Sequence, residues 1–249
     1  MNTLALLQSA WPYLLKGTGY TLLFAVGAMV GGLLVGALLA VLRLSGVKAL
    51  QWPAALYVSA MRGTPLLVQI FIIYYGLPAI GIQFEPITAG ILALSLNTGA
   101  YVSETMRGAI NGVDRGQWEA AFSQGMGRWQ TLHYIVWPQA LRLAVPSLSN
   151  SLISLIKDTS LVSVIAVTEL MLATKEVIST TFQPFPLYVA AAAIYWCLSL
   201  IFLSRCNACW NAAWGAPWRA NRNPPAPHRW VSTHQTKLFP RTVFFGMPL

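Results

Sequence analysis

Residues 17–42 form a run of 26 residues without a charged side chain, and this run constrains the fold more than any other feature. About 20 apolar helical residues cross the hydrocarbon core of a bilayer, so the run is long enough to span it with some tilt. Only 9% of the whole chain is charged and 56% is hydrophobic, whereas soluble domains carry about a quarter charged residues. These features predict an all-α integral membrane protein.

Four further segments are predicted to span the membrane, which makes about five transmembrane helices. The second uncharged run covers 63–84, where Thr64 is suited to cap a helix and Pro65 to its first turn. The preceding residues 50–61 are predicted to lie at the interface. The remaining predicted spans are 86–103, 143–166 and 186–203.

Glycines recur four residues apart within the first span. Gly27, Gly31, Gly32 and Gly36 have the spacing of small residues that lets transmembrane helices approach closely. We therefore expect another helix to pack tightly against this face.

The basic residues of the loops predict the orientation of the chain. Seven loop residues and six tail residues, thirteen in all, fall on one side of the predicted spans, whereas Lys16 and Lys175 fall on the other. The excess marks the cytoplasmic side. The seven loop residues are Arg43, Lys48, Arg62, Arg107, Arg115, Arg128 and Arg142. This places the N-terminus outside and the C-terminus in the cytoplasm; the first apolar run is predicted to remain as an anchor, because it is too long for a signal peptide.

A polar block at 111–142 separates two of the predicted spans. Glu119, Ala120 and Ala121 favour a helix, Gly125 favours a turn, and a second amphipathic helix is predicted to follow. Pro138 is expected to break or kink that helix before the next span. By charge asymmetry this block lies on the cytoplasmic side.

The spacing within this block resembles the coupling loop of the membrane subunits of ABC importers. That loop reads Glu-Ala-Ala, three residues, Gly, nine residues, Ile, any residue, Leu, Pro. Here Glu119, Ala120, Ala121, Gly125, Ile135 and Pro138 match it, and Trp137 replaces the usual Leu. The flanking segments 62–69, 97–108, 116–117, 138–140 and 157–161 are similar to the polar amino acid subfamily of these permeases, with Ser103 in place of Ala. The resemblance covers about residues 10–204.

This resemblance implies a type I ABC importer permease with the MetI-like architecture. In that family two permease subunits, identical or sister chains, pair in the bacterial cytoplasmic (inner) membrane. Separate ATP-binding subunits dock beneath the coupling loops, and a periplasmic or surface-tethered binding protein delivers the amino acid from outside. ATP-driven closure would then be transmitted through residues 119–138 to reorient the spans in an alternating-access cycle.

Polar residues within the predicted spans are candidates for a substrate pathway, because they are costly in lipid unless they face a partner or a wet cavity. Asn97, Tyr101 and Glu104 share one face of a helix and suit an α-amino acid. For Glu104 an ion pair with Arg107 or Lys157 is the alternative, as is a position at the cytoplasmic edge. Asp158 is also a candidate, with helix packing or a subunit interface as its alternative.

Other chemistries lack their sequence signatures. No Gly-x-x-x-x-Gly-Lys-[Ser/Thr] loop occurs, so ATP is expected to be hydrolysed by a partner rather than by this chain. The three histidines show no metal-ligand spacing, and Cys206 and Cys209 form a lone Cys-x-x-Cys pair that favours free thiols. We expect no cofactor, no metal site, no enzymatic site and no nucleic-acid partner.

The segment 205–249 departs from the rest of the chain. It has six basic residues and no acidic one, and it is rich in Trp and Pro. We therefore separate a permease domain, 1–204, from an atypical tail, 205–249, for which disorder or a shifted reading frame is predicted and a membrane-surface helix is the alternative. Two other functional hypotheses remain at this point. One is a secondary carrier or channel that acts without an ATPase, and the other is a product that no longer assembles.

Overall fold

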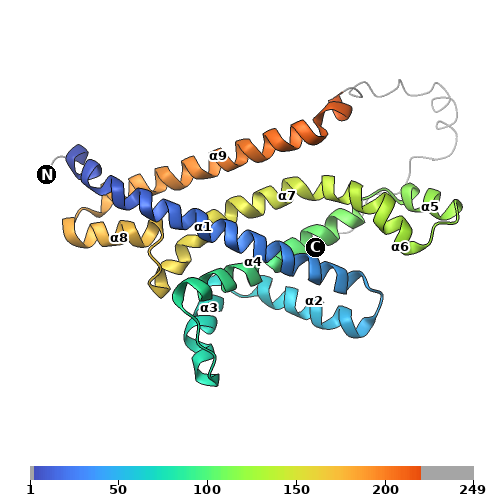
Figure 1. Ribbon diagram of the computed structural model, residues 1–249, viewed down its shortest axis with the longest axis horizontal. Helices are drawn as coiled ribbons and strands as arrows, with labels where there is room; N and C mark the ends of the chain where they lie inside the picture. The colour runs from blue at the N-terminus through green and yellow to red at the C-terminus, as the bar shows by residue number, and fades with distance from the viewer. Residues whose placement is uncertain (1–2, 220–249) are drawn as a thin grey trace, which may run out of the picture. The chain divides into compact units, whose positions relative to one another are not determined.

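The computed structural model describes residues 3–219, and every regular element in this part of the chain is a helix. The chain divides into two units, Met1–Cys209 and Trp210–Leu249, and the helical bundle belongs to the first. In chain order the elements are α1 (Thr3–Leu44), α2 (Lys48–Gly63), α3 (Leu66–Phe71), a π-helical turn (Ile72–Gly76), a 3-10 helix (Leu77–Ile80), α4 (Pro86–Asn111), α5 (Arg115–Ser123), α6 (Arg128–Thr131), a π-helical turn (Leu132–Val136), α7 (Trp137–Asp158), a 3-10 helix (Thr159–Ile165), α8 (Leu170–Thr181) and α9 (Pro184–Arg219), as Figure 1 shows.

The long helix α1 packs most extensively against α4, and glycines form the contact. A Cβ atom added at Gly32 would lie 2.7 Å from Thr98 Cγ2, and one added at Gly36 would lie 2.5 Å from Val102 Cγ1. Real Cβ atoms do not approach other atoms this closely, so only glycine allows the observed separation of the two backbones. The close packing predicted from the glycine spacing is therefore present.

The largest apolar core lies among α1, α3, α4, α7 and the 3-10 helix that follows α7. Phe24, Ile70, Leu94, Leu155 and Val162 are almost completely buried there. Burial of these side chains holds the middle of the bundle together, since each contributes about 1.5–3 kcal/mol when fully buried.

The second predicted span begins at a sharp bend. Helix α2 and the helical segment Leu66–Ile80 meet at an angle of 109°, with the break at residues 64–65, where the span was predicted to begin. Pro65 precedes the first helical residue, and Thr64 ends α2 instead of capping the next helix, so the expected cap was placed at the wrong point. The predicted interfacial segment 50–61 is part of α2, which packs against α1 and α4 through the buried side chains of Ala54 and Val58.

A buried polar cluster joins α8 to α1 and α9. Both oxygens of the Glu169 carboxylate accept hydrogen bonds from backbone N–H groups, Met171 and Leu172, each at 2.8 Å. The Tyr195 hydroxyl donates to the same carboxylate at 2.8 Å, and Leu170 N–H donates to the Thr21 hydroxyl at 3.2 Å. Glu169 precedes α8, between the predicted spans, and its burial raises the pKa of the carboxyl above its ordinary value.

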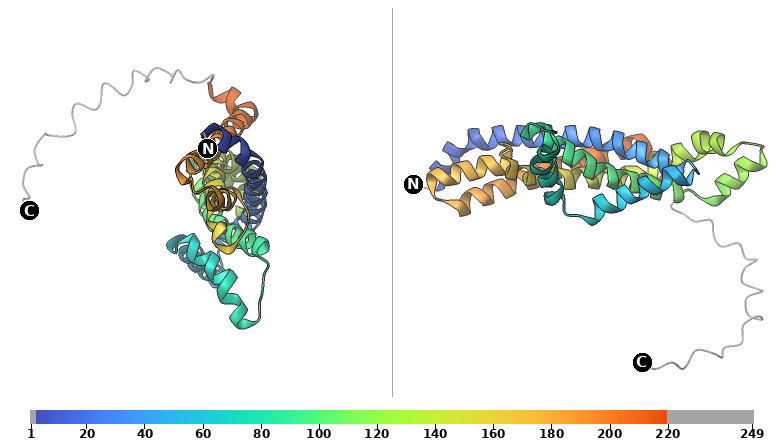
Figure 2. Two further views of the ribbon diagram at one scale, coloured as in Figure 1. Left: turned by 90° about the vertical axis from the view of Figure 1, so that its left-hand side faces the viewer. Right: turned by 90° about the horizontal axis from the view of Figure 1, so that it is seen from below.

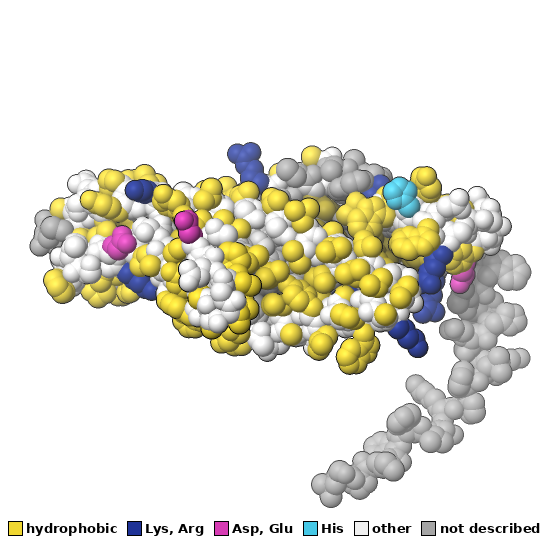
Figure 3. Space-filling model, turned by 60° about the horizontal axis from the view of Figure 1, so that its bottom comes forward, with side chains coloured by type: hydrophobic (Ala, Val, Ile, Leu, Met, Phe, Trp, Pro, Cys, Tyr) yellow, Lys and Arg dark blue, Asp and Glu magenta, His cyan; other side chains and the backbone are white. Residues whose placement is uncertain are grey.

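The surface carries many large apolar side chains, as expected of a protein that faces lipid. Among residues 3–219, α1 and the Pro184–Ala212 part of α9 are long and apolar enough to cross a membrane, and the bent pair α2 and Leu66–Ile80 adds a third candidate. Figure 3 shows one face whose middle is mostly hydrophobic, with charged side chains mainly toward its two ends. The exposed apolar residues of α1 include Leu23, Val26, Val30, Leu34, Leu38 and Val41.

Helix α9 continues past the predicted end of the permease domain and runs to Arg219. The first part of the predicted tail, 205–219, is therefore helical in the structure. The remainder, 220–249, lies outside the described residues, so disorder stays a prediction there, and a shifted reading frame stays a prediction for the whole of 205–249.

Candidate functional site

A polar cavity of about 590 Å³ lies between the α2–α3 break, α4 and α7. Three of the four residues predicted to line a substrate pathway face it: Asn97, Tyr101 and Asp158. The volume falls within the range of about 300–1,000 Å³ that is usual for small-molecule sites. The other lining residues are Thr64, Pro65, Leu66, Thr98, Thr105, Ser147, Asn150, Ser151, Ser154 and Leu155.

One wall of the cavity is a stripe of polar side chains on α7 that was not predicted from the sequence. Its members recur at spacings of three and four residues, so they share one face of the helix. That periodicity, inside a predicted span, was the signal that could have revealed them. The stripe consists of Ser147, Asn150, Ser151, Ser154 and Asp158.

Asn97 contributes to the cavity wall and also holds the break between α2 and α3. Its side-chain nitrogen donates to the carbonyl oxygen of Met61 at 3.2 Å and to Gln69 Oε1 at 3.0 Å. The side-chain nitrogen of Gln69 in turn donates to Met61 O at 2.9 Å and to Thr64 O at 3.2 Å. The two amides satisfy carbonyl groups that the interrupted helix leaves without helical partners, which a low-dielectric interior requires.

Tyr101 and Asp158 supply the phenol ring and the carboxylate of the cavity. The Tyr101 side chain is 43% exposed, and the guanidinium carbon of Arg62 lies 5.5 Å from the ring centroid. Asp158 is half-buried at the end of the α7 stripe, and the adjacent Lys157 lines a separate groove together with Tyr195 of α9. The prediction that these adjacent residues point in different directions is confirmed.

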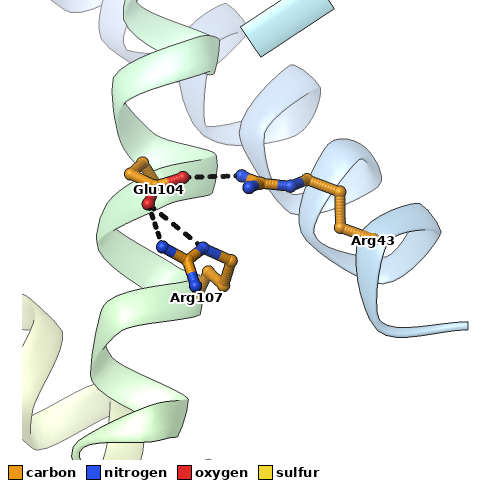
Figure 4. A network of polar contacts seen from close by, with 3 residues as sticks. All are labelled: Arg43, Glu104 and Arg107. Carbon is orange, nitrogen blue, oxygen red and sulfur yellow. Dashed lines mark hydrogen bonds and ion pairs between the residues drawn. The ribbon is translucent and has the colours of Figure 1, made fainter. Parts of the chain in front are cut away.

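Glu104 does not line this cavity. Its carboxylate forms ion pairs with Arg107, one turn further along α4, and with Arg43 of α1, where Nη1 and Oε2 are 2.7 Å apart (Figure 4). The structure therefore contains the ion pair with Arg107 that was the alternative to substrate contact. The partner from α1 was not predicted, since 61 residues separate it from Glu104.

The polar block forms two short helices at the opposite end of the bundle from α8 (Figures 1 and 2). Helix α5 ends at a left-handed glycine, Gly125, whose φ is +80°. Gly125 N–H donates to Phe122 O at 2.9 Å and Met126 N–H donates to Ala121 O at 3.2 Å, the paired bonds of a Schellman turn. The predicted helix, glycine turn and helix are present.

The side chains of α5 divide between packing and exposure. Ala121 is buried, while Glu119 and Ala120 are exposed. Trp118 packs against the ends of α4 and α7, and the side chain of Gln139 donates to Gln117 Oε1 at 3.1 Å. The segment is thus fixed to the bundle on one face and open on the other. Its exposed large apolar side chains are Phe122, Trp129 and Tyr134.

The helix that follows the glycine turn is not broken at Pro138, so of the predicted break or kink the structure contains no break. The chain stays helical from Arg128 to Asp158, because the turn Leu132–Val136 widens to a π-helical turn just before the proline. Such a turn accommodates a residue that lacks the N–H group of a regular helix. Ile135 is half-buried on this turn, and Pro138 occupies the first turn of α7.

Trp137, which departs from the resembling motif, has a packing role. Its indole lies against two apolar clusters, one with Val136 and Ala140 and one with Val102 and Met106. A larger side chain than Leu thus fills the contact between α7, α4 and the end of α1.

The described residues contain no group of three or more His, Cys, Asp or Glu side chains arranged to hold a metal ion.

A membrane-embedded helical bundle with a polar interior cavity, and with an exposed pair of helices at one end, defines a transport subunit. The family model for the binding-protein-dependent transport system inner membrane component matches residues 28–204, and the chain belongs to this family. It is a permease of an ABC transporter, which excludes the secondary carrier and channel hypotheses.

Individual proteins and structures agree with this family. The probable amino-acid ABC transporter permease protein YckA of Bacillus subtilis is 44% identical over 200 residues, which cover 80% of this chain and 88% of YckA. The L-cystine transport system permease protein TcyB of the same organism is 44% identical over 195 residues, covering 78% and 83%. A crystal structure of an amino acid ABC transporter with histidines matches with a TM-score of 0.81 at 34% identity, covering 85% of this chain and 99% of that one.

Proposed function

We propose that this chain is the permease subunit of an ATP-driven importer for polar amino acids, and that the cavity lined by Asn97, Tyr101 and Asp158 is part of the substrate path. The observation that carries the proposal is the polar cavity between the α2–α3 break, α4 and α7. In lipid, such a concentration of hydroxyl, amide and carboxylate groups is expected only where it faces water or a polar solute.

The chemistry of the cavity suits an α-amino acid. The Asp158 carboxylate can pair with an ammonium group, and the α7 hydroxyls and the Tyr101 phenol can donate to a carboxylate. Because the Asn97 amide nitrogen is engaged at the α2–α3 break, its side-chain oxygen is the atom we assign to the substrate. The names of TcyB and of the glutamine transport system permease protein GlnP of Escherichia coli, which is 36% identical over 194 residues, support a polar amino acid as cargo.

The face of α5 and α6 that carries exposed side chains is proposed to dock on a separate ATPase subunit. Glu119 supplies the charged contact, and the small side chains of Ala120 and Ala121 allow other elements to approach α5 closely. Gly125 fixes the turn between the two helices. Ile135 and Pro138 direct the second helix into α7. Two copies of the permease, identical or sister chains, would pair in the complex. A binding protein would dock at the opposite end, near α8.

The proposed topology has about five spans, with the N-terminus outside the bacterial inner membrane and the C-terminus in the cytoplasm. The charge distribution supports it, because Arg43 and Arg107 lie toward the α5–α6 end of the bundle and Lys175 lies on α8. We propose residues 1–204 as the permease domain and 205–249 as a separate tail.

The substrate assignment is tested by reconstituting the permease with its ATPase and binding protein and screening amino acids for stimulated ATP hydrolysis. Asp158→Asn is expected to raise the concentration of amino acid required for half-maximal stimulation. Glu176→Gln is the matched control, since Glu176 is an exposed carboxylate on α8, outside the cavity. Stimulation by sugars or metal ions alone would refute the cargo, and equal effects of the two substitutions would refute the role of Asp158.

The docking assignment is tested by reversing one charge. Glu119→Lys is expected to reduce co-purification of the ATPase, or to lower substrate-stimulated ATP hydrolysis, because the exposed carboxylate faces the proposed partner. Glu176→Lys makes the same charge change on α8, at the opposite end of the bundle, and is expected to leave co-purification of the ATPase unchanged. Intact co-purification with unaltered stimulated hydrolysis in Glu119→Lys would rule out this contact.

A further inference from the structure

A network of three charged side chains connects the ends of α1 and α4 that lie nearest the α5–α6 pair. The Glu104 carboxylate uses one oxygen for each partner: Oε2 accepts from Arg43 Nη1 at 2.7 Å, and Oε1 accepts from Arg107, including Nε at 3.1 Å (Figure 4). The exposed fractions of the side chains are 16% for Arg43, 24% for Glu104 and 41% for Arg107. The Arg43–Glu104 contact, which joins the two helices, is thus more buried than the Arg107–Glu104 contact.

The two arginines differ in what they connect. Arg107 lies three residues after Glu104 on the same helix, so their contact does not hold α4 to any other element. Arg43 lies in the last turn of α1, and its contact is the one in this network that joins two helices. The network therefore has an intrahelical arm and an interhelical arm that share one carboxylate.

Because Glu104 pairs with two arginines, breaking its contact with Arg43 costs less free energy than breaking an isolated ion pair. Removing one member of a sheltered ion pair is normally costly, because the remaining charge loses its compensation. Here Glu104 remains paired with Arg107 when Arg43 moves away. Arg43 lies in the last turn of α1, at the end of the helix that is proposed to face the cytoplasm. The arrangement permits two discrete states, one with α1 held to α4 and one with α1 released.

The network also lies next to the proposed coupling segment. Ile110 and Val113, at the end of α4, pack in one apolar cluster with Trp118 of α5. Leu44, which follows Arg43, packs against the same cluster. A displacement of α5 thus acts directly on the ends of both helices that the Arg43–Glu104 contact joins.

We propose that Arg43 and Glu104 form an exchangeable latch between α1 and α4, which is closed in this structure and opens in another conformation of the transport cycle. Arg107 holds the carboxylate in both conformations. Arg43 and Glu104 are positioning residues in this assignment, because neither lines the cavity. The link of the latch to a transport cycle rests on the proposed function, whereas its presence between the two helices does not.

The test compares Arg43→Gln with Arg107→Gln, which make the same charge change on the two sides of one carboxylate. Pulsed electron spin resonance would measure the distance between nitroxide labels at Val41→Cys and Gly108→Cys in the complete complex, with Cys197, Cys206 and Cys209 replaced by Ser. Val41 is exposed on α1, and a Cβ at Gly108 would meet no other atom within 4 Å. Arg43→Gln is expected to enlarge the population with separated helix ends, and Arg107→Gln to enlarge the closed population.

The opposite directions distinguish a latch from a merely stabilising contact. Shifts in the same direction, or no shift with Arg43→Gln, would overturn the proposal. Arg43→Lys keeps a positive donor and is expected to restore the closed population; a distribution like that of Arg43→Gln would also overturn it. This variant keeps the test decisive if Arg43→Gln fails to fold.

A second measurement addresses coupling. The number of amino acids transported for each ATP hydrolysed is expected to fall by about threefold or more in Arg43→Gln, and to fall less in Arg107→Gln. Equal losses in the two variants would overturn the coupling role. If the unmodified complex shows no amino-acid-stimulated hydrolysis, the proposed function fails, while the distance measurement still decides whether the latch exists.

Discussion

Gly36→Ala tests whether the separation of α1 and α4 is set by their glycines. A Cβ atom at this position would lie 2.5 Å from Val102 Cγ1 and 3.0 Å from the carbonyl oxygen of Gly99. Val102 is branched at Cβ and has few alternative rotamers, and the second obstacle is backbone. Neither can move without displacing α4, so the substitution is expected to overpack the interface.

The magnitude follows from a comparison with Gly27→Ala in the same helix. At Gly27 the nearest atom to an added Cβ is Ile91 Cδ1 at 3.7 Å, an ordinary van der Waals contact. Both substitutions gain the same helix-propensity term of about 1 kcal/mol, which cancels in the difference. The free energy of unfolding of Gly36→Ala should therefore lie about 1–3 kcal/mol below that of Gly27→Ala, the usual cost of overpacking.

The assay is reversible unfolding in mixed detergent micelles, with far-ultraviolet circular dichroism as the signal and the unmodified chain as reference. Each variant is titrated with denaturing detergent, and the free energies are compared at one composition. Equal stabilities for the two variants, or a more stable Gly36→Ala, would refute the reasoning. Either result would mean that the helices can separate at little cost.

Three other substitutions test the polar and packing assignments. Asn97→Leu removes the donor to Met61 O and Gln69 Oε1, so the free energy of unfolding should fall by about 1–3 kcal/mol; an unchanged value would argue against the amide bridge at the α2–α3 break. Trp137→Leu restores the residue of the resembling motif but leaves a void beside Val102 and Met106, with an expected loss of about 1–3 kcal/mol in the same titration; a gain would contradict the packing role. Burial raises the pKa of Glu169 in the folded state, so the unfolded chain ionises first and stability should fall as pH rises from about 4, its ordinary pKa, through the raised value. Glu169→Gln should flatten this dependence above about pH 4, and an equally steep profile would contradict the assignment.

The features that sequence predicted well are those set by neighbouring residues. Gly125 marks a turn because a left-handed φ favours glycine, and the helices on either side follow from short-range propensity and capping. The face of α1 that packs closely against α4 could also be predicted, because Gly32 and Gly36 are about one helical turn apart and lie on one side of the helix. Such signals lie within a few residues of one another along the chain.

The features that were missed depend on partners distant in the chain. The start of the second span at Thr64 and Pro65 was predicted, but the 109° angle between α2 and Leu66–Ile80 was not, because the amide that holds it lies 36 residues beyond Met61. Glu104 was assigned to the cavity because it shares a helix face with Asn97, but Arg43 is the partner that draws it to α1.

The double role of Asn97 limits how the cavity can vary among related transporters. Its nitrogen is committed to the carbonyl of Met61 and to Gln69, so a different side chain here would alter the shape of the chain as well as the lining of the cavity. Ser151 and Ser154 line the same cavity from an intact helix, where no interrupted backbone depends on their side chains. Changes in cargo preference should therefore accumulate on α7, while the α2–α3 break and its amides stay as they are.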